Sequence, residues 1–373
     1  LGDELSSNEE HRWFIYLIEG KLDLLEIDKP SVLLQSTDNR ALHPLFIEGE
    51  YKTRLIAQAN SVVLRFDRQL FNTLMDKEVI TSEELETVEM DEVEGSLFNE
   101  IMHDFNLGQL KLPSLPDVAE KIKKALDSTD ISAEDLVRII SSDPAVAARF
   151  IKKAKGNHAN MASSVCSIAS SIELLGLYTS KKIVSAMAEK EPFITQSSLL
   201  DQRMRALYDQ SVDTAALSLS ISRESDTTTP DHMMLAGLLS EIGVISILSY
   251  IESTGMNIDT EIELEQIICH LRSAVGSMVI KHFGLSTDLF SVVDNFESWE
   301  HQDEGEVDAC DIVIIAQIYH RLKHHQVHGL PKINEVPALK KLCIKEDNAE
   351  FAKHVFQQAH EEVSSIVKLL NMC

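Results

Sequence analysis

Short apolar runs dominate the first part of the chain. The segment WFIYLIEGKLDLLEI contains two such runs separated by Glu19 and Gly20, and RLIAQANSVVLRFD repeats the arrangement around Ala59 and Asn60. Gly and Asn favour turns, so we interpret both breaks as hairpins between β-strands. Together with a short helix at DRQLFNTLM, the pattern predicts a small sheet domain over residues 1–78.

An acidic segment follows. In TSEELETVEMDEVEGS the acidic residues are accompanied by no Lys or Arg, and there is no strong apolar stripe. Repulsion between like charges favours an exposed helix or a linker, which we weigh above an acidic binding motif. Residues 79–98 are therefore expected to connect the sheet domain to the rest of the chain.

Over residues 99–373 the apolar positions recur with the period of an α-helix. In ISAEDLVRIISSD, Ser132 and Asp135 have the spacing of a capping box at a helix start. Asp143 caps the next helix, and Pro144 occupies its first turn, where a missing N–H costs nothing. No convincing strand interrupts the series. The sequence predicts an α+β multidomain protein, with a small N-terminal β-roll followed by a large all-α domain.

The charge balance excludes several classes of partner. The formal net charge is -26 and the isoelectric point is about 4.9, so the chain would repel nucleic acid and anionic lipid. Apolar runs such as DIVIIAQIY are far shorter than the roughly 20 residues of a membrane helix, so no membrane association is expected. The cysteines are widely spaced and form no CxxC pair, which is typical of a reduced cytoplasmic protein: Cys166, Cys269, Cys310, Cys343 and Cys373.

Four segments of the helical part resemble the HDOD family, the output-type relatives of the HD-domain phosphohydrolases. They are LPSLPDVAEKI, IISSDPAVAARFIKKA, SSIELLGLYTSKKIV and LAGLLSEIGVISIL, and the resemblance covers most of residues 107–320. The segments GDELSSNEEHRWFIYLIEGKLDLL and IAQANSVVLRFDRQLFNTLM are similar to the end of a cyclic-nucleotide-binding β-roll. The opening helix and first strand of such a roll would lie before Leu1, so the resemblance implies an incomplete roll.

The first resemblance also implies where a metal site would lie. HD-domain phosphohydrolases hold one or two cations with a His, a His-Asp pair and a distant Asp, and a bound water then loses its proton near neutral pH. On this chain these positions fall on Gln210, on Ser240 with Glu241, and on Gln317. Neutral amides and a hydroxyl are poor ligands for a transition metal. The resemblance therefore implies a vestigial site with no catalytic residue and no metal.

Two further histidine positions of the family are also replaced. One falls on Arg272, which would add positive charge beside a cation, and a His-His pair falls near Glu297 and Ser298. Glu241 is left as the anionic candidate. For this residue we favour a surface carboxylate at a helix end over a polar residue of an old pocket paired with Arg272, because an unpaired buried carboxylate is costly.

A second candidate pocket lies in FIEGEYKTRLIA. It offers Glu48, Gly49, Glu50 and Arg54, residue types that hold the ribose and phosphate in cyclic-nucleotide pockets. The resemblance places Tyr51 where the arginine of that family would stand, and the segment from Glu50 to Arg54 is too short for the usual phosphate-binding helix. We therefore expect a roll kept for packing or dimerisation and no cyclic nucleotide binding.

The segment YHRLKHHQVHG spaces His320, His324 and His328 four residues apart on a predicted helix. Histidines at this spacing can bind zinc, although zinc sites usually add Cys or carboxylate ligands. We favour a solvated helix end, where positive charge complements the helix dipole, with adventitious metal binding at most.

These expectations combine into one reading of the function. The chain is expected to be a cytoplasmic signal-transduction protein of bacterial type that acts through contacts with other signalling proteins, without cofactors or nucleic acid, and a homodimer is left open. Two alternatives remain: a metal-dependent phosphohydrolase with an unusual ligand set, and a sensor gated by a cyclic nucleotide or another small molecule.

Overall fold

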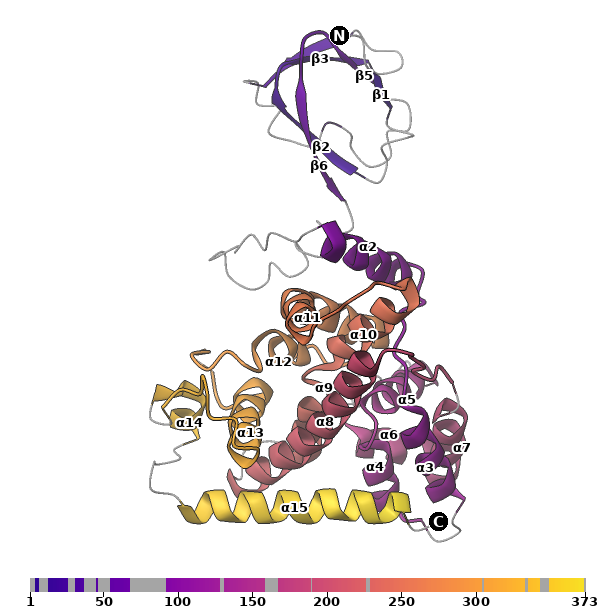
Figure 1. Cartoon of the computed structure of the whole chain (residues 1–373), viewed down its shortest axis with the longest axis vertical. Coiled ribbons are helices and arrows are strands. Elements are labelled where there is room, and N and C mark those ends of the chain that lie inside the picture. Colours follow the sequence, from indigo (N-terminus) through magenta and orange to yellow (C-terminus); the bar gives the residue numbers. More distant parts are fainter. Residues whose placement is uncertain are drawn as a thin grey trace. The chain divides into compact units, whose positions relative to one another are not determined.

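The computed structural model divides the chain into two compact units, Leu1–Thr87 and Val88–Cys373 (Figure 1). We call them the β unit and the helical unit. The structure describes residues 4–6, 13–25, 31–36, 45, 54–67, 92–127, 131–157, 167–188, 190–225, 229–303, 305–332, 335–342 and 349–371. The predicted α+β class, with a small sheet region followed by a large helical domain, is confirmed.

The β unit contains two antiparallel sheets. Four strands pair in the order β1-β5-β3-β4, and β2 pairs with β6. Apolar side chains from both sheets form one core, which includes Ile15, Leu22, Leu34 and Leu55. The strands are β1 (Glu4–Ser6), β2 (Trp13–Glu19), β3 (Lys21–Leu25), β4 (Val32–Gln35), β5 (Arg54–Ala57) and β6 (Val62–Asp67).

Gly20 makes a bend and not the predicted hairpin. β2 and β3 are consecutive in the chain but do not pair with each other, because β2 pairs with β6 and β3 with β5. A Cβ at Gly20, whose φ is +97°, would lie 2.5 Å from Asn60 O and 2.4 Å from Ser61 Oγ. Only glycine accepts both this φ and this close approach. The two apolar runs on each side of Gly20, and those on each side of Asn60, therefore pass from one sheet to the other.

Apart from an isolated parallel β-bridge between Ser114 and Pro192, the elements that the structure describes in the helical unit are helices. They are α2 (Glu92–Asn106), α3 (Pro116–Leu126), α4 (Ala133–Ile140), α5 (Pro144–Asn157), α6 (Ile168–Leu175), α7 (Leu177–Ala188), α8 (Ser198–Ser225), α9 (Pro230–Leu239), α10 (Ile242–Thr254), α11 (Glu261–Phe283), α12 (Leu289–Asn295), α13 (Ala309–Lys323), α14 (Pro337–Lys341) and α15 (Ala349–Asn371).

The helix-capping residues have the roles that the sequence predicts. Ser132 and Asp135 form a reciprocal capping box at the start of α4. Asp143 accepts a hydrogen bond from Val146 N at 2.9 Å, and α5 begins at Pro144. Helix α2 begins inside the predicted linker, and its Leu97 side chain is buried. Positions 79–91, and the predicted helix at residues 68–75, lie outside the described residues.

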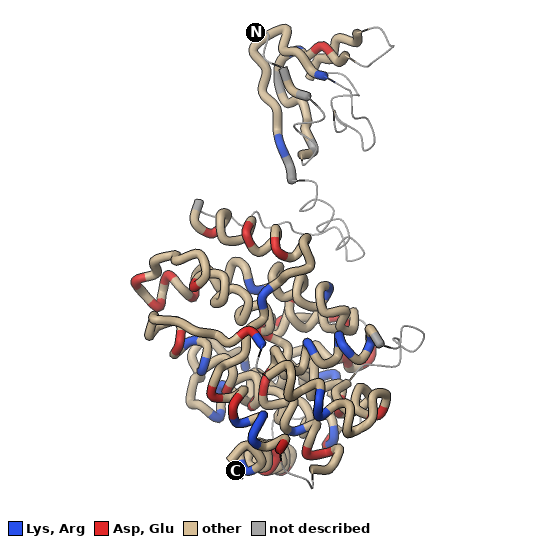
Figure 2. Tube along the Cα trace, turned by 90° about the vertical axis from the view of Figure 1, so that its right-hand side faces the viewer, with Lys and Arg blue, Asp and Glu red and all other residues tan. Residues whose placement is uncertain are grey.

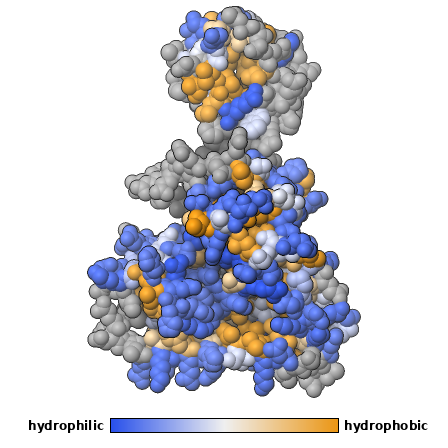
Figure 3. Space-filling model, viewed as in Figure 1, coloured by the Kyte–Doolittle hydropathy of each residue, from blue (hydrophilic) through white to orange (hydrophobic). Residues whose placement is uncertain are grey.

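The long helix α8 is the organising element of the helical unit. It packs against α9, α13 and α15, and α15 runs along one side of the unit (Figure 1). Acidic and basic residues are interspersed over this unit (Figure 2), and the face seen in Figure 3 is mostly hydrophilic with separate apolar patches. Burial of one face of α15 against α8 explains the regular apolar period of that helix.

The span Pro230–Thr254, which covers α9 and α10, is long and apolar enough to cross a membrane by length and composition. The expectation that no segment is long enough for a membrane helix rested on shorter apolar runs and did not include this span. Nearly all of it is buried among the other helices, as in a core element of a helical domain. The described structure thus gives this apolar span a packing role.

Candidate functional site

Three residues from distant parts of the sequence meet inside the helical unit. Gln210 lies in α8, Gln317 in α13, and Glu241 at the turn between α9 and α10. The Nε2 of Gln210 donates hydrogen bonds to Glu241 Oε1 at 2.5 Å and to Gln317 Oε1 at 3.3 Å. We call these three residues the polar cluster. They occupy positions that the HDOD resemblance assigned to metal ligands.

Close helix packing fixes the turn that carries Glu241. A Cβ at Gly237 would lie 2.7 Å from Thr214 O in α8, and a Cβ at Gly243 would lie 2.5 Å from Gly276 N in α11. Both glycines therefore allow backbones to approach more closely than any other residue would permit. Ser240 is also buried at this turn, and its hydroxyl donates to Gly237 O at 3.0 Å.

Glu241 is not the surface carboxylate that the sequence favoured. The residue is 7% exposed, and burial raises its pKa, although Arg203 works in the opposite direction. Arg203 NH2 lies 3.9 Å from Glu241 Oε2, and its Nε donates to Glu265 at 2.5 Å. The close helix packing around the turn outweighs the solvation that would otherwise keep this carboxylate outside.

Arg272 pairs with Glu297 and not with Glu241. Its NH1 donates to Glu297 Oε2 at 2.5 Å, and Arg321 donates to the other oxygen of Glu297. Burial raises the pKa of Glu297, but the two arginines outweigh it and hold this pKa below its usual value. Arg272 also lies over the ring of Phe296, 4.7 Å from its centroid. An ion pair between Arg272 and Glu297 therefore occupies the two further histidine positions of the family.

The polar cluster has a limited set of donor groups. It offers one carboxylate and two neutral amides, and these are poor ligands for a transition metal. The amide of Gln317 is fully buried, and its Nε2 has no hydrogen-bond partner among the residues described. The cluster can hold α8, α10 and α13 in register. Gln210 belongs to α8 and Gln317 to α13, and Glu241 is the N-cap residue of α10.

A second group, next to the polar cluster, contains Asp213, which was not recognised in the sequence. Asp213 lies one helical turn after Gln210, and its Oδ2 lies 3.0 Å from His320 Nδ1 and 3.5 Å from His324 Nε2. We call Asp213, His320 and His324 the Asp-His group. The available signal was the three-residue spacing from Gln210, which places Asp213 on the same helix face.

The predicted row of three histidines is wrong in one member. α13 ends at Lys323, so His324 is the C-cap residue and His328 lies beyond the helix in a turn. His320 is also buried, and it contacts Asp213 instead of solvent. The helix stops early because His325 adopts a left-handed backbone conformation with φ +57°, which cannot continue an α-helix.

A further carboxylate group, Asp303, Asp308 and Asp311, has a local structural role. Asp308 Oδ1 accepts from Asp311 N at 2.9 Å and so caps α13. Lys341 donates to Asp311 at 2.9 Å and also to Asp303. Capping and the lysine account for the gathering of these carboxylates without a bound ion.

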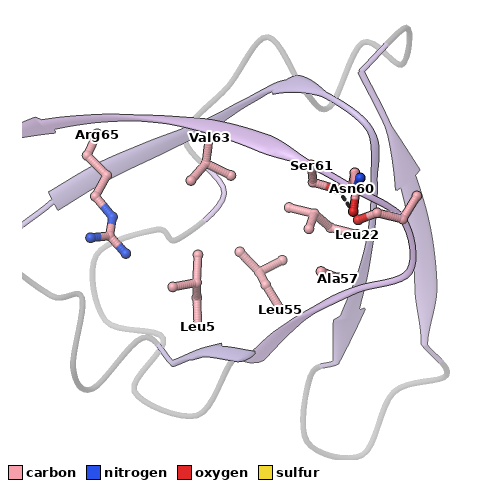
Figure 4. A pocket seen from close by; sticks show the side chains of 9 residues that line it. Leu5, Leu22, Leu55, Ala57, Asn60, Ser61, Val63 and Arg65 are labelled. Atoms are coloured by element: carbon pink, nitrogen blue, oxygen red, sulfur yellow. Dashed lines mark hydrogen bonds between the residues drawn. The ribbon is translucent and has the colours of Figure 1, made fainter. Parts of the chain in front are cut away.

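The β unit contains a cavity of about 320 Å³ (Figure 4). Arg65 lies at one end, Asn60 and Ser61 at the other, and apolar side chains such as Leu55 and Val63 lie between. The candidate nucleotide residues at positions 48–50 lie outside the described residues. Arg54 is exposed in β5 and is not one of the residues that line this cavity.

Comparison with known proteins decides the family of the helical unit. The sequence model of the HDOD domain matches residues 112–297. The chain carries an HDOD domain. The match includes Gln210, Glu241 and Arg272, whereas α13, with Gln317 and His320, follows the matched part of the HDOD domain. The search of curated proteins found no match.

Solved structures were also compared with this chain, and the one with a TM-score of 0.50 supports the fold of the HDOD domain. A fragment of the MmoQ response regulator from Methylococcus capsulatus has a TM-score of 0.50 at 19% identity, over 65% of this chain and 94% of that one. A protein from Shewanella amazonensis, provisionally named a metal-dependent phosphohydrolase, has a TM-score of 0.45 at 19% identity, over 74% and 100%. An HDOD domain protein of unknown function from Geobacter sulfurreducens has a TM-score of 0.36 at 16% identity, over 76% and 99%.

Proposed function

We propose that the protein is a cytoplasmic signalling protein whose HDOD domain acts through contacts with other proteins and not through metal-dependent hydrolysis. The observation that carries this proposal is the direct hydrogen bonding of Gln210 to Glu241 and Gln317. In a hydrolase these positions would have to hold a cation and its water. Here the side chains bond to each other.

The surrounding charges support the same proposal. Arg203 lies 3.9 Å from Glu241, and Arg272 donates a hydrogen bond to Glu297. Both arginines lower the pKa of Glu241 electrostatically, which means that positive charge already acts on the carboxylate that a cation would need. A divalent cation would meet repulsion from these arginines, and apart from one carboxylate it would find only neutral amides, which are poor ligands.

The family supports the signalling part of the proposal. HDOD domains are the output-type relatives of HD phosphohydrolases, and the MmoQ structure, which shares the fold, is named a response regulator. Contacts with a partner would use the outer surface of the helical unit, while the polar cluster would keep α8, α10 and α13 in one arrangement.

A hydrolysis assay tests this proposal. The full chain, stripped of metal and reloaded separately with Mn²⁺, Fe²⁺ and Zn²⁺, is expected to release no product from cyclic nucleotides, cyclic dinucleotides or nucleoside triphosphates. An active HD-domain phosphohydrolase, prepared in the same way, provides the positive control. Metal-dependent turnover that disappears in Glu241→Ala would overturn the proposal and favour the enzyme alternative.

The cavity of the β unit favours a second function, the sensing of a small molecule. Its volume lies at the lower end of the range for ligand pockets, and its apolar lining with polar groups at both ends is typical of such sites. Titration calorimetry with cyclic AMP and cyclic GMP tests this function. Binding that is weakened by Arg65→Ala and retained in Arg54→Ala would support this function, since Arg65 lines the cavity and Arg54 does not. Absence of heat with both nucleotides would leave the roll a packing role.

A further inference from the structure

The Asp-His group joins two helices at a point that the HD chemistry does not use. Asp213 comes from α8, His320 from α13 and His324 from the C-cap of α13. Asp213 and His320 each follow a member of the polar cluster by three residues, so the group lies one helical turn further along both helices. One ligand atom from each of its three residues lies within 4.8 Å of the others.

The spacing of these atoms suits a tetrahedral metal ion. Zinc binds imidazole nitrogen and carboxylate oxygen at about 2.0–2.2 Å, so adjacent ligand atoms of a tetrahedral site are about 3.3 Å apart. Asp213 Oδ2 lies 3.0 Å from His320 Nδ1 and 3.5 Å from His324 Nε2. Two of the three separations are therefore within about 0.3 Å of the expected value, and movement of the exposed His324 side chain would adjust the third.

The contacts of Asp213 suit a metal ligand. Lys323 Nζ lies 2.5 Å from Oδ1, whereas both histidines contact Oδ2. The lysine therefore orients the carboxylate through one oxygen and leaves the other for coordination.

The exposure of the group allows an ion to enter. Asp213 and His320 are buried, while the side chain of His324 is 48% exposed. The two buried ligands are held in place by packing, and the exposed one can close over an ion from the solvent side. A fourth position is left for water or for a group from a partner.

We propose that Asp213, His320 and His324 bind a divalent transition metal ion of the zinc class and thereby fasten the end of α13 to α8. Two imidazoles and one carboxylate select Zn²⁺ and its neighbours over Mg²⁺ and Ca²⁺, which prefer oxygen ligands. The ion joins segments separated by 107 residues. This site does not depend on the proposed function, because it shares no residue with the polar cluster.

Metal titration of the full chain tests the site. Chelator-stripped protein is expected to bind one equivalent of Zn²⁺ in competition with a chromophoric chelator, and Co²⁺ is expected to give the visible absorption of a site with nitrogen ligands. His324→Gln and Asp213→Asn are each expected to weaken Zn²⁺ binding by at least about tenfold. Zn²⁺ should also raise the melting temperature of the wild type, and less so that of His324→Gln.

His328→Gln is the matched control, because His328 lies four residues further along the same segment but outside the group. It is expected to bind Zn²⁺ like the wild type. Asp213→Asn removes a partner of Lys323 and can impair folding, whereas His324 is exposed, so His324→Gln keeps the test decisive. Absence of stoichiometric binding, or equal losses in His324→Gln and His328→Gln, would overturn the site. Hydrolysis lost in Asp213→Asn but kept in Glu241→Ala would support the site and contradict the proposed function.

Discussion

At the scale of single residues, two glutamates near the HD positions have opposite electrostatics. Glu241 has a raised pKa because burial dominates, and Glu297 has a lowered pKa because two arginines outweigh its burial. Nothing in the local sequence distinguishes them. The difference arises because Glu297 receives direct hydrogen bonds from Arg272 and Arg321, whereas NH2 of Arg203 lies 3.9 Å from the Glu241 carboxylate.

The raised pKa of Glu241 predicts how stability depends on pH. A carboxyl with a folded pKa above its unfolded value contributes most below the unfolded pKa of about 4.3 and loses this contribution as pH rises through the folded pKa. Glu241→Gln keeps an oxygen that can accept from Gln210 and removes the buried charge. We expect this variant to match or exceed the wild-type free energy of unfolding at pH 7 to 8, with a smaller advantage near pH 4.

Urea unfolding at a series of pH values provides the measurement. A clear loss of stability in Glu241→Gln at pH 7 would show that the contact with Arg203 dominates the burial of the carboxylate, and it would contradict this prediction.

The contribution of Glu297 to stability depends on pH in the opposite direction. Its lowered pKa means that its contribution is present above the unfolded pKa of about 4.3 and is lost as pH falls through the folded pKa. Glu297→Gln is expected to reduce the free energy of unfolding by about 1.5–3 kcal/mol at pH 7, because two charged hydrogen bonds weaken. The difference from the wild type should shrink in acid.

Glu335→Gln is the control, since Glu335 pairs with Lys332 at the surface, where both side chains are well exposed. Its change should stay within about 0.5 kcal/mol. Equal changes in the two variants would show that the arginines around Glu297 provide no more than surface charge does.

At the scale of secondary-structure elements, close helix contacts decide where the site forms. The backbone of α10 at Gly243 approaches that of α11 so closely that a Cβ would lie 2.6 Å from Arg272 O. This close approach brings the turn that carries Glu241 next to the backbone of Arg272. Gly237 and Gly243 therefore set the distance between helices.

Gly243→Ala is expected to lower the free energy of unfolding by about 1–3 kcal/mol, because the backbone atoms that a Cβ meets can only move with their helix. Gly95→Ala is the matched control, because it lies within α2 and an added Cβ there meets nothing within 4 Å. It should stabilise the protein by up to about 1 kcal/mol through helix propensity. Denaturant unfolding compares the two variants, and similar effects would contradict close packing at Gly243.

At the scale of the whole molecule, each unit has its own core. Ile15 is fully buried in the β unit and Ile139 in the helical unit. Each core is assembled from residues of its own unit, which is the usual condition for a unit to unfold as one step.

Ile15→Ala and Ile139→Ala are expected to act on different unfolding transitions. Each should cost about 2–5 kcal/mol in its own unit, as do other large-to-small core substitutions. Calorimetry or circular dichroism should show the β-sheet transition lowered by Ile15→Ala and the helical transition lowered by Ile139→Ala. A single transition that moves equally with both variants would show one cooperative unit.

The sequence by itself determined the features that depend on neighbouring residues. The capping box at Ser132, the helix start at Pro144 and the apolar faces of the helices arise from groups within a few residues of one another. The change from a β period to a helical period also separated the two classes of unit. The resemblance to HDOD proteins implied that Gln210, Glu241 and Gln317 belong to one site.

Only the tertiary structure decided what those residues contact. It turned the break at Gly20 into a bend, buried Glu241, paired Arg272 with Glu297 and placed Asp213 beside His320 across 107 residues of chain. The physical reason is that the pKa of a carboxylate and the partner of a charged group depend on burial and distance, and both are set by helices that are far apart in sequence but packed side by side.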